Sequence, residues 1–285
     1  SAMNDLRPVI LIGAARSGTK FVRDLLGASP VFARIPYDVN YVWRMGAKVD
    51  HDVLTPDMLD PRTRERIKKT LHHLARKNSG DGRLLEKTVS NTLRVPYVDA
   101  ILPDAVFLHL VRDGHAVVES ATRMWQEPPD SQGLRRKLID MPWSSLGYAA
   151  WFGLNQVRGR LRGRSGGEIW GPRYPGIFED IKKLPLLEIV TRQWEQSVSR
   201  ATHDLQQIAP ERVYTVRYED LMGDSVEVDR LCDFLKIDRR DAIHRRFAEQ
   251  ADRSNMRKWR DRLTDDQIAT IHRIAGDMLR HYRYL

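Results

Sequence analysis

The sequence predicts a three-layer α/β fold, with a P-loop-like order of elements and a central parallel sheet between two layers of helices. Three observations favour this fold. Residues 9–12 and 105–111 are almost entirely apolar, which is typical of strands buried on both faces of a parallel sheet. A turn of small residues follows the first run, and a helix-like pattern begins directly after it. Further short strands, each followed by a helical pattern, continue towards the end of the chain.

The length and composition indicate one domain over residues 4–285. A chain of 285 residues is long enough to bury a full core, and its hydrophobic content of 41% is ordinary. Residues 1–3 resemble the remnant of a cleaved tag, and we recognise no signal peptide. We find no apolar run of about 18 residues, the length that a membrane span needs. The single cysteine, Cys232, excludes an internal disulfide and a cysteine metal site, and together these features predict a cytoplasmic protein.

The charge of the chain favours an anionic partner. Its net charge is +9 and its pI is about 9.7. The basic residues are spread along the chain, and neither a zinc-finger spacing nor an RNA-recognition signature accompanies them. We therefore predict a small anionic ligand and no nucleic acid.

The turn after the first strand, residues 13–18, has the composition of a phosphate-binding loop. Small residues let backbone N–H groups approach a phosphate, and the N-terminus of the following helix favours an anion. Arg16 and Lys20 add positive charge, although a plain tight turn has a similar pattern. The loop ends in Thr19-Lys20, which reverses the Lys-Thr order that a magnesium nucleotide site requires. This reversal weakens the interpretation as a kinase or NTPase.

The segment A-R-S-G-T at residues 15–19 resembles the 5′-phosphosulfate loop of the sulfotransferases, which use 3′-phosphoadenosine 5′-phosphosulfate (PAPS). Those loops commonly read P-[KR]-S-G-T-[TS]. Ala15 replaces the usual proline, and Lys20 replaces a second hydroxyl residue. A basic residue at the position of Lys20 is similar to the heparan-type branch of the family. The resemblance implies that the nucleotide's 5′-phosphate is bound by Arg16, Ser17, Gly18, Thr19 and Lys20.

After the first helix comes an aromatic-rich segment, residues 35–44, that is suited to the wall of a cleft. The heparan and tyrosyl-protein branches similarly carry a base carboxylate at this remove from the loop. The resemblance therefore implies that Asp38 is the general base, while a turn-capping aspartate is an equal alternative. Residues 57–77 then predict a solvated helix that starts after Thr55-Pro56.

A second strand, residues 83–85, leads into Glu86-Lys87-Thr88, and residues 93–102 predict a helix. The family often has a similar E-K-[TS]-P segment beside the transferred group, although Val89 stands here in place of the proline. The resemblance implies that Lys87 neutralises the sulfuryl oxygens. A purely structural lysine at the end of a strand is the alternative.

The strand over residues 105–111 ends at Arg112, and a helix begins near residue 114. This order places Arg112 at the carboxyl edge of the sheet, where ligands bind in this architecture. The spacing R-D-x-x-x-x-x-x-S resembles the family's 3′-phosphate motif and implies that Arg112 and Ser120 hold the 3′-phosphate. A local ion pair between Arg112 and Asp113 is the simpler alternative.

Residues 126–186 are the least regular part of the chain. Pro128-Pro129 opens this segment, residues 143–161 have helical spacing, and residues 158–167 are basic and rich in glycine. An acceptor-side lid and a solvated insertion fit this pattern equally well. The arginines here fit an anionic acceptor, such as a carbohydrate or a phosphorylated molecule.

The C-terminal part carries two softer resemblances. R-Y-E-D-L at residues 217–221 is similar to a family segment that approaches the adenine, which implies that Tyr218 stacks on the base and that Phe21 covers its other face. Residues 252–260 resemble the family's late basic loop without its usual glycine, and imply that Arg253 closes over the 3′-phosphate. The elements predicted here are a helix over 188–208, a strand over 212–216, a helix over 226–235 and a closing helix over 264–282 capped by Thr264.

The resemblance covers the chain nearly from end to end and implies a PAPS-dependent sulfotransferase. The expected reaction is in-line transfer to a hydroxyl or amine acceptor, with adenosine 3′,5′-bisphosphate (3′,5′-ADP) as product and with no metal. Two alternatives remain open, a small-molecule kinase that uses ATP and magnesium, and a nucleotide-binding protein without catalytic activity.

Overall fold

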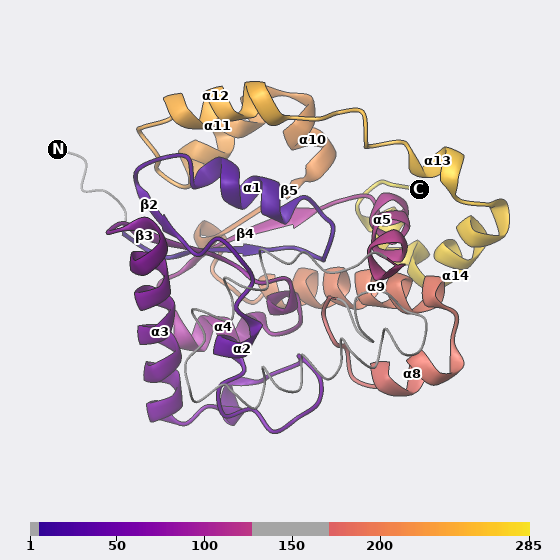
Figure 1. Cartoon of the computed structure of the whole chain (residues 1–285), viewed down its shortest axis with the longest axis horizontal. Coiled ribbons are helices and arrows are strands. Elements are labelled where there is room, and N and C mark those ends of the chain that lie inside the picture. Colours follow the sequence, from indigo (N-terminus) through magenta and orange to yellow (C-terminus); the bar gives the residue numbers. More distant parts are fainter. Residues whose placement is uncertain (1–5, 127–170) are drawn as a thin grey trace.

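The computed structural model describes residues 6–126 and 171–285. In this part of the chain, one parallel sheet of five strands has the order β2-β3-β1-β4-β5 (Figure 1). The sheet confirms the predicted fold class. Its strands are β1 (Val9–Ile12), β2 (Phe32–Arg34), β3 (Arg83–Lys87), β4 (Val106–Val111) and β5 (Val213–Arg217).

The central strand, β1, is buried on both faces, as its apolar run predicts. It pairs in parallel with β3 and with β4, so that Val9 lies opposite Leu85 on one side and opposite Val106 on the other. Its side chains alternate between two hydrophobic clusters, one on each face of the sheet. Period-two alternation within a wholly apolar strand is what a sheet covered on both faces requires.

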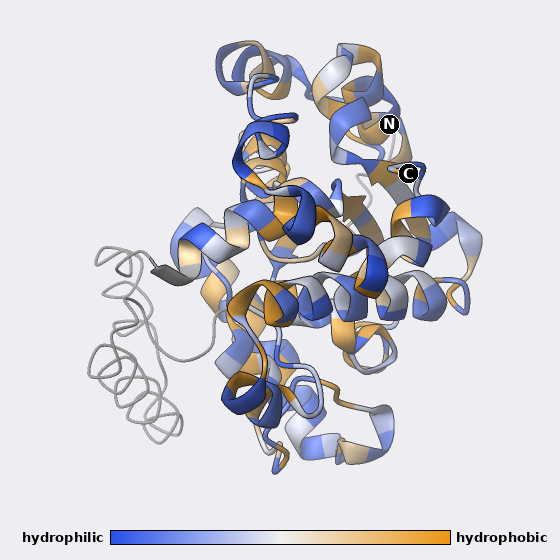
Figure 2. Cartoon of the chain, turned by 90° about the vertical axis from the view of Figure 1, so that its right-hand side faces the viewer, coloured by the Kyte–Doolittle hydropathy of each residue, from blue (hydrophilic) through white to orange (hydrophobic). Residues whose placement is uncertain are grey.

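Helices cover both faces of the sheet (Figure 1). Each helix in Figure 2 alternates hydrophobic and hydrophilic residues, as expected when one side of a helix packs on the core. The first face carries α1 (Thr19–Leu26), α10 (Tyr218–Gly223), α11 (Ser225–Phe234) and α12 (Asp241–Gln250). The second face carries α2 (Asn40–Trp43), α3 (Pro61–Ser79), α4 (Val95–Ile101) and α9 (Leu186–Leu205), and around α9 pack α5 (Gly114–Gln126), α8 (Ile177–Lys183) and α14 (Asp265–His281).

Several element boundaries differ from the sequence-based expectation. The helix predicted from residue 57 begins at Pro61, because the side chain of Asp60 accepts the Thr63 N–H at 2.9 Å and caps it. The turn that follows Thr55 is a separate 3-10 helix, η1 (Pro56–Met58). Strand β2 and helices α10, α12 and α13 (Trp259–Arg262) had no counterpart in the prediction. The Thr264 cap of α14 is confirmed, and Gln267 completes a capping box.

The segment predicted as a lid or insertion lies partly outside the described residues. Two of its predicted features fall within residues 127–170, outside the described residues. They are the helix expected over residues 143–161 and the basic stretch over 158–167. Within the described part, the chain re-enters at Gly171 and forms α8 before α9. Among the helices of residues 6–126 and 171–285, none is long and apolar enough to cross a membrane.

The topology predicts a ligand-binding crevice at the carboxyl edge of the sheet. The chain leaves β1 into α1, which packs on the first face. It leaves the neighbouring strands β3 and β4 into α4 and α5, which belong to the clusters on the other side. Where adjacent connections leave towards opposite faces, the carboxyl ends of parallel strands form a ligand-binding crevice.

Candidate active site

The loop between β1 and α1 follows the central strand and therefore lies at the carboxyl edge of the sheet. Its backbone enters the left-handed region at Arg16, with φ 65°, and at Gly18, with φ 86°. The Ser17 N–H donates to the Ala14 carbonyl at 3.2 Å, which closes the turn. The Ser17 hydroxyl is buried and has no hydrogen-bond partner in the described part of the chain. An unpaired buried hydroxyl at a helix N-terminus is suited to an external anion.

Arg112 connects this loop to the end of β4. One of its terminal nitrogens donates to the Arg16 carbonyl at 3.1 Å. Its guanidinium carbon lies 4.7 Å from the centre of the Tyr218 ring, within the range of a cation–π contact. The Arg112 Nε is buried and has no partner among the described residues. Arg112 is therefore held in place while retaining an unused donor.

Arg16 turns towards α5, where its Nε donates to the Ser120 hydroxyl at 2.9 Å. Ser120 is buried at 7% exposure, in contrast to the exposed Lys20 on the first turn of α1. The crevice thus brings together predicted residues from four separate segments, namely Arg16, Arg112, Ser120 and Tyr218. The Ser17 hydroxyl and the Arg112 Nε are the unpaired donors of this group, and both are suited to phosphate oxygens.

Asp38 and Lys87 form a second group at the same edge of the sheet. The Lys87 ammonium lies 2.5 Å from the Asp38 carboxylate, whose other oxygen accepts the Val89 N–H at 3.1 Å. The Lys87 side chain is 9% exposed and the Asp38 side chain 23% exposed. Helix α2 begins two residues later, at Asn40, with Val39 as its N-cap residue. The structure therefore pairs the two residues that were assigned separate roles.

Sequence reasoning missed the buried carboxyl group beneath this pair. The Thr88 hydroxyl donates to Glu86, and Asn91 donates to the other oxygen at 3.2 Å. Burial raises the pKa of Glu86 to about 7. The Val39 N–H donates to the Thr88 hydroxyl at 2.9 Å, so this network also holds the backbone next to Asp38. The only sequence signal was the position of Glu86 beside Lys87.

A fully buried aspartate, Asp52, forms a further centre that no sequence pattern indicated. Ser90 donates to it at 3.0 Å and the Arg173 backbone N–H at 2.9 Å. The guanidinium groups of Arg44 and Arg173 lie 3.1 and 3.2 Å from its other oxygen. Burial alone raises the pKa of Asp52, but Arg173, Arg94 and Arg44 outweigh it and hold that pKa well below its usual value. Asp52 thereby anchors the chain at its re-entry after residue 170.

The remaining predicted residues are Arg253, Phe21 and Tyr218. The Arg253 Nε donates to the Met222 carbonyl at 2.8 Å, which holds the late loop against the end of α10. No contact in the described part of the chain joins Arg253 to Arg112 or Ser120. Phe21 is partly buried against the apolar core beneath α1. Tyr218 is 8% exposed, with Arg112 over its ring.

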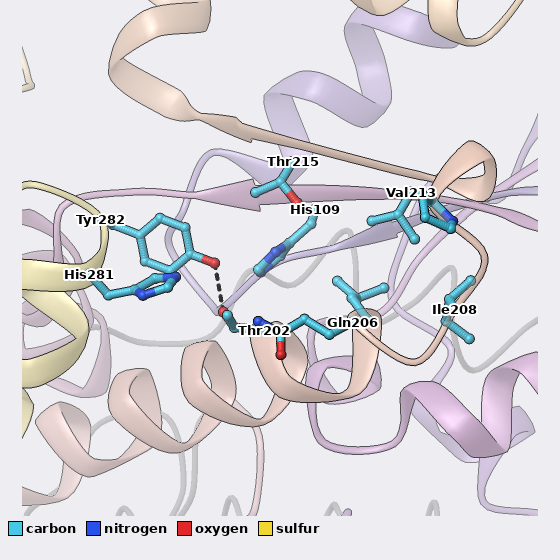
Figure 3. Close-up of a pocket in the computed structure, with 10 residues that line it drawn as sticks. His109, Thr202, Gln206, Ile208, Val213, Thr215, His281 and Tyr282 are labelled. Atoms are coloured by element: carbon cyan, nitrogen blue, oxygen red, sulfur yellow. Dashed lines mark hydrogen bonds between the residues drawn. The ribbon is translucent and has the colours of Figure 1, made fainter.

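A separate cavity of about 400 Å³ lies between the sheet and α9 (Figure 3). The His109 imidazole faces it, and the Tyr282 hydroxyl lies 2.6 Å from that of Thr202 at its rim. Burial lowers the pKa of His109 to about 4. No ring nitrogen of His109 is hydrogen-bonded within the described residues. Arg16, Arg112 and Ser120 do not line this cavity.

Comparisons with known proteins identify the family. The family model described as "Sulfotransferase family" matches residues 8–152 and 181–241. No curated protein matches the sequence. The sulfotransferase domain from the curacin biosynthetic pathway is 14% identical, with a TM-score of 0.54 over 96% of this chain and 98% of its own. Sulfotransferase STF9 from Mycobacterium avium is 13% identical, with a TM-score of 0.53 over 96% of this chain and 76% of its own. The two structures share the fold, and the family match shows that this chain belongs to the sulfotransferases, enzymes that transfer a sulfuryl group.

Proposed function

We propose that this sulfotransferase takes the sulfuryl group from PAPS and transfers it to a hydroxyl or amine acceptor. The observation that carries the proposal is the convergence of the β1–α1 loop, Arg16, Arg112 and Ser120 in one crevice. PAPS has phosphate groups on both sides of its ribose, so it needs two separate anion sites. The loop supplies one and the end of β4 supplies the other.

The 5′-phosphate site is built from the loop and the start of α1. The proposed donors are the backbone N–H groups of Gly18 and Thr19 and the unpaired Ser17 hydroxyl, and the exposed Lys20 adds a positive charge on the first turn of α1. When bound, PAPS supplies the sulfuryl group and a phosphate as leaving group. Arg16 stabilises the negative charge that grows on that phosphate as the bond to sulfur breaks.

The 3′-phosphate site consists of Arg112 and Ser120. In the free protein, the Ser120 hydroxyl accepts a hydrogen bond from the Arg16 side chain. Arg112 donates to the backbone carbonyl of Arg16. The unused Nε of Arg112 becomes available to a phosphate oxygen without breaking these bonds. Tyr218 and Phe21 are the proposed contacts of the adenine, and Arg253 approaches from the late loop.

Asp38 and Lys87 supply the chemistry of the acceptor. Asp38 takes the proton from the acceptor hydroxyl or amine as its oxygen or nitrogen attacks sulfur. The Lys87 ammonium, 2.5 Å from Asp38, orients the carboxylate and offsets the charge of the sulfuryl oxygens. The Asp38–Lys87 pair supports catalysis over a purely nucleotide-binding role. The arginines of the chain favour an anionic acceptor, such as a carbohydrate.

Calorimetric titration with 3′,5′-ADP and, separately, with ATP and magnesium tests the proposal. We expect 3′,5′-ADP to bind and ATP with magnesium to give no response. Arg112→Ala should weaken 3′,5′-ADP binding about 10- to 100-fold, the scale of a lost hydrogen bond to a charged group. The matched control is Arg245→Ala, which removes an exposed arginine on α12. If ATP with magnesium binds and 3′,5′-ADP gives no response, the proposal is overturned in favour of a kinase.

A further inference from the structure

The C-terminal residues 282–285 fold back onto the carboxyl edge of the sheet. The Tyr284 hydroxyl donates to the Glu219 carboxylate at 2.7 Å, and the Val111 carbonyl lies 3.3 Å from the same hydroxyl. Val111 is the last residue of β4, and Glu219 lies in the first turn of α10. The segment thereby links the C-terminus to the two elements that carry Arg112 and Tyr218.

These contacts surround the backbone of Arg112. The second carboxylate oxygen of Glu219 accepts the Asp113 N–H at 3.0 Å. The Val111 carbonyl belongs to the peptide before Arg112, and the Asp113 N–H belongs to the peptide after it. The Tyr284–Glu219 pair therefore contacts both peptide groups that flank Arg112, while the Arg112 guanidinium contacts Arg16 and Tyr218.

The protein environment preserves the roles of donor and acceptor in this pair. Burial raises the pKa of Tyr284, and the neighbouring Glu219 charge raises it further, so that its hydroxyl remains a donor at neutral pH. Arg217 holds the segment in place, with its guanidinium carbon 5.5 Å from the centre of the Tyr284 ring and a hydrogen bond of 3.2 Å to the Tyr282 carbonyl. Glu219 is partly buried, and this burial raises the pKa of its carboxyl group.

We propose that Tyr284 is a positioning residue for Arg112, and that through it the C-terminal segment sets the affinity for the 3′-phosphate of the nucleotide. Tyr284 does not touch the nucleotide. It fixes the strand end from which Arg112 projects, and a charge-assisted hydrogen bond depends on small displacements of its donor. The inference rests on the proposed function, because it assumes that Arg112 binds a 3′-phosphate.

The test compares two nucleotides that differ only at the 3′ position, 3′,5′-ADP and adenosine 5′-phosphate. Tyr284→Phe keeps the aromatic ring over Arg217 and removes only the hydroxyl. We expect it to weaken 3′,5′-ADP binding about threefold to tenfold, the scale of one net hydrogen bond, and to leave adenosine 5′-phosphate binding unchanged. In the Arg112→Ala background, Tyr284→Phe should have no further effect on 3′,5′-ADP.

Tyr282→Phe is the matched control. It removes one hydroxyl from the same segment, but that hydroxyl bonds to Thr202 on α9 at 2.6 Å. We expect it to leave the ratio of the two affinities unchanged. Glu219→Ala, which removes the shared acceptor, is a second variant and should shift the ratio in the same direction as Tyr284→Phe.

The outcomes separate this inference from the proposed function. If Arg112→Ala leaves 3′,5′-ADP binding unchanged, the assignment of the 3′-phosphate site fails. If Arg112→Ala weakens binding while Tyr284→Phe and Glu219→Ala leave the ratio of affinities unchanged, the positioning role of Tyr284 is overturned. An equal loss for both nucleotides also overturns it, because a merely structural role would weaken both.

Discussion

Asp38 and Lys87 carry opposite charges and form an ion pair, so each fixes the position of the other in the free protein. Asp38 is held by Lys87 and by the Val89 N–H, so its two oxygens have fixed directions. A positioned carboxylate near a reacting hydroxyl accelerates proton transfer by about 100- to 10,000-fold. The proposed mechanism places that whole contribution on Asp38.

Asp38→Ala should lower turnover by about 100-fold or more and leave 3′,5′-ADP affinity within about threefold, because the carboxylate acts on the acceptor and not on the nucleotide. Transfer of labelled sulfuryl groups to an acceptor found by screening measures the first quantity, and calorimetry measures the second. The exposed Asp57→Ala on η1 is the control and should match the wild type. Wild-type turnover in Asp38→Ala would sink the assignment of the general base.

At the scale of elements, the site depends on how tightly the β1–α1 loop packs against α10. A Cβ added at Gly18 would lie 2.4 Å from the Tyr218 ring, and the φ of +86° there is strained for any other residue. Gly176, the N-cap residue of α8, has a similar left-handed backbone with φ +90°, but an added Cβ would meet nothing within 4 Å. The two glycines therefore share backbone strain and differ in close approach.

Gly18→Ala should abolish 3′,5′-ADP binding, because the added methyl group displaces Tyr218 and with it the cation–π partner of Arg112. Gly176→Ala should cost about 1 kcal/mol of stability from strain alone and leave binding intact. Thermal unfolding and calorimetry of both variants measure these effects. Equal nucleotide affinity in the two variants would show that the loop does not depend on its contact with Tyr218.

At the scale of the whole molecule, two buried groups give the stability opposite dependences on pH. His109 has a pKa of about 4 against an ordinary 6.5, so between these values only the unfolded chain binds the proton, and stability rises with pH. Glu86 has a pKa of about 7 against an ordinary 4.5, so between these values only the folded chain binds the proton, and stability falls as pH rises. The two effects offset each other between about pH 4.5 and 6.5.

Removing either group should expose the effect of the other. In His109→Phe, the free energy of unfolding should fall from pH 4.5 to 6.5, and in Glu86→Gln it should rise over the same range. Each change in the free energy of unfolding is on the order of 3 kcal/mol. In the wild type, the two groups together should contribute almost nothing to the slope of this free energy against pH. Denaturant unfolding at several pH values measures the slopes. Parallel slopes in the wild type and both variants would contradict the assignment.

The sequence predicted four of the five strands, and it singled out Arg16, Arg112 and Ser120, which the structure brings together, because these signals are local. A wholly apolar strand followed by a loop such as 13–18, or by Arg112, is visible within about ten residues. Glu86, Asp52 and Tyr284 were not found, because their roles arise from segments that only the folded chain brings together. Asp52, for example, meets Arg94 and Arg173, which are remote from it in sequence. The start of α3 was misjudged because two capping signals lie close together.

The anchoring of Arg173 on Asp52 also has an evolutionary consequence. The chain leaves the framework after α5 and is secured again at Arg173, while Arg16, Arg112, Ser120 and Tyr218 all lie outside the intervening stretch. The proposed donor-binding machinery is therefore encoded separately from residues 127–170. Substitutions within that stretch therefore leave every one of these four side chains unchanged, so the proposed donor site can be inherited intact while the stretch varies.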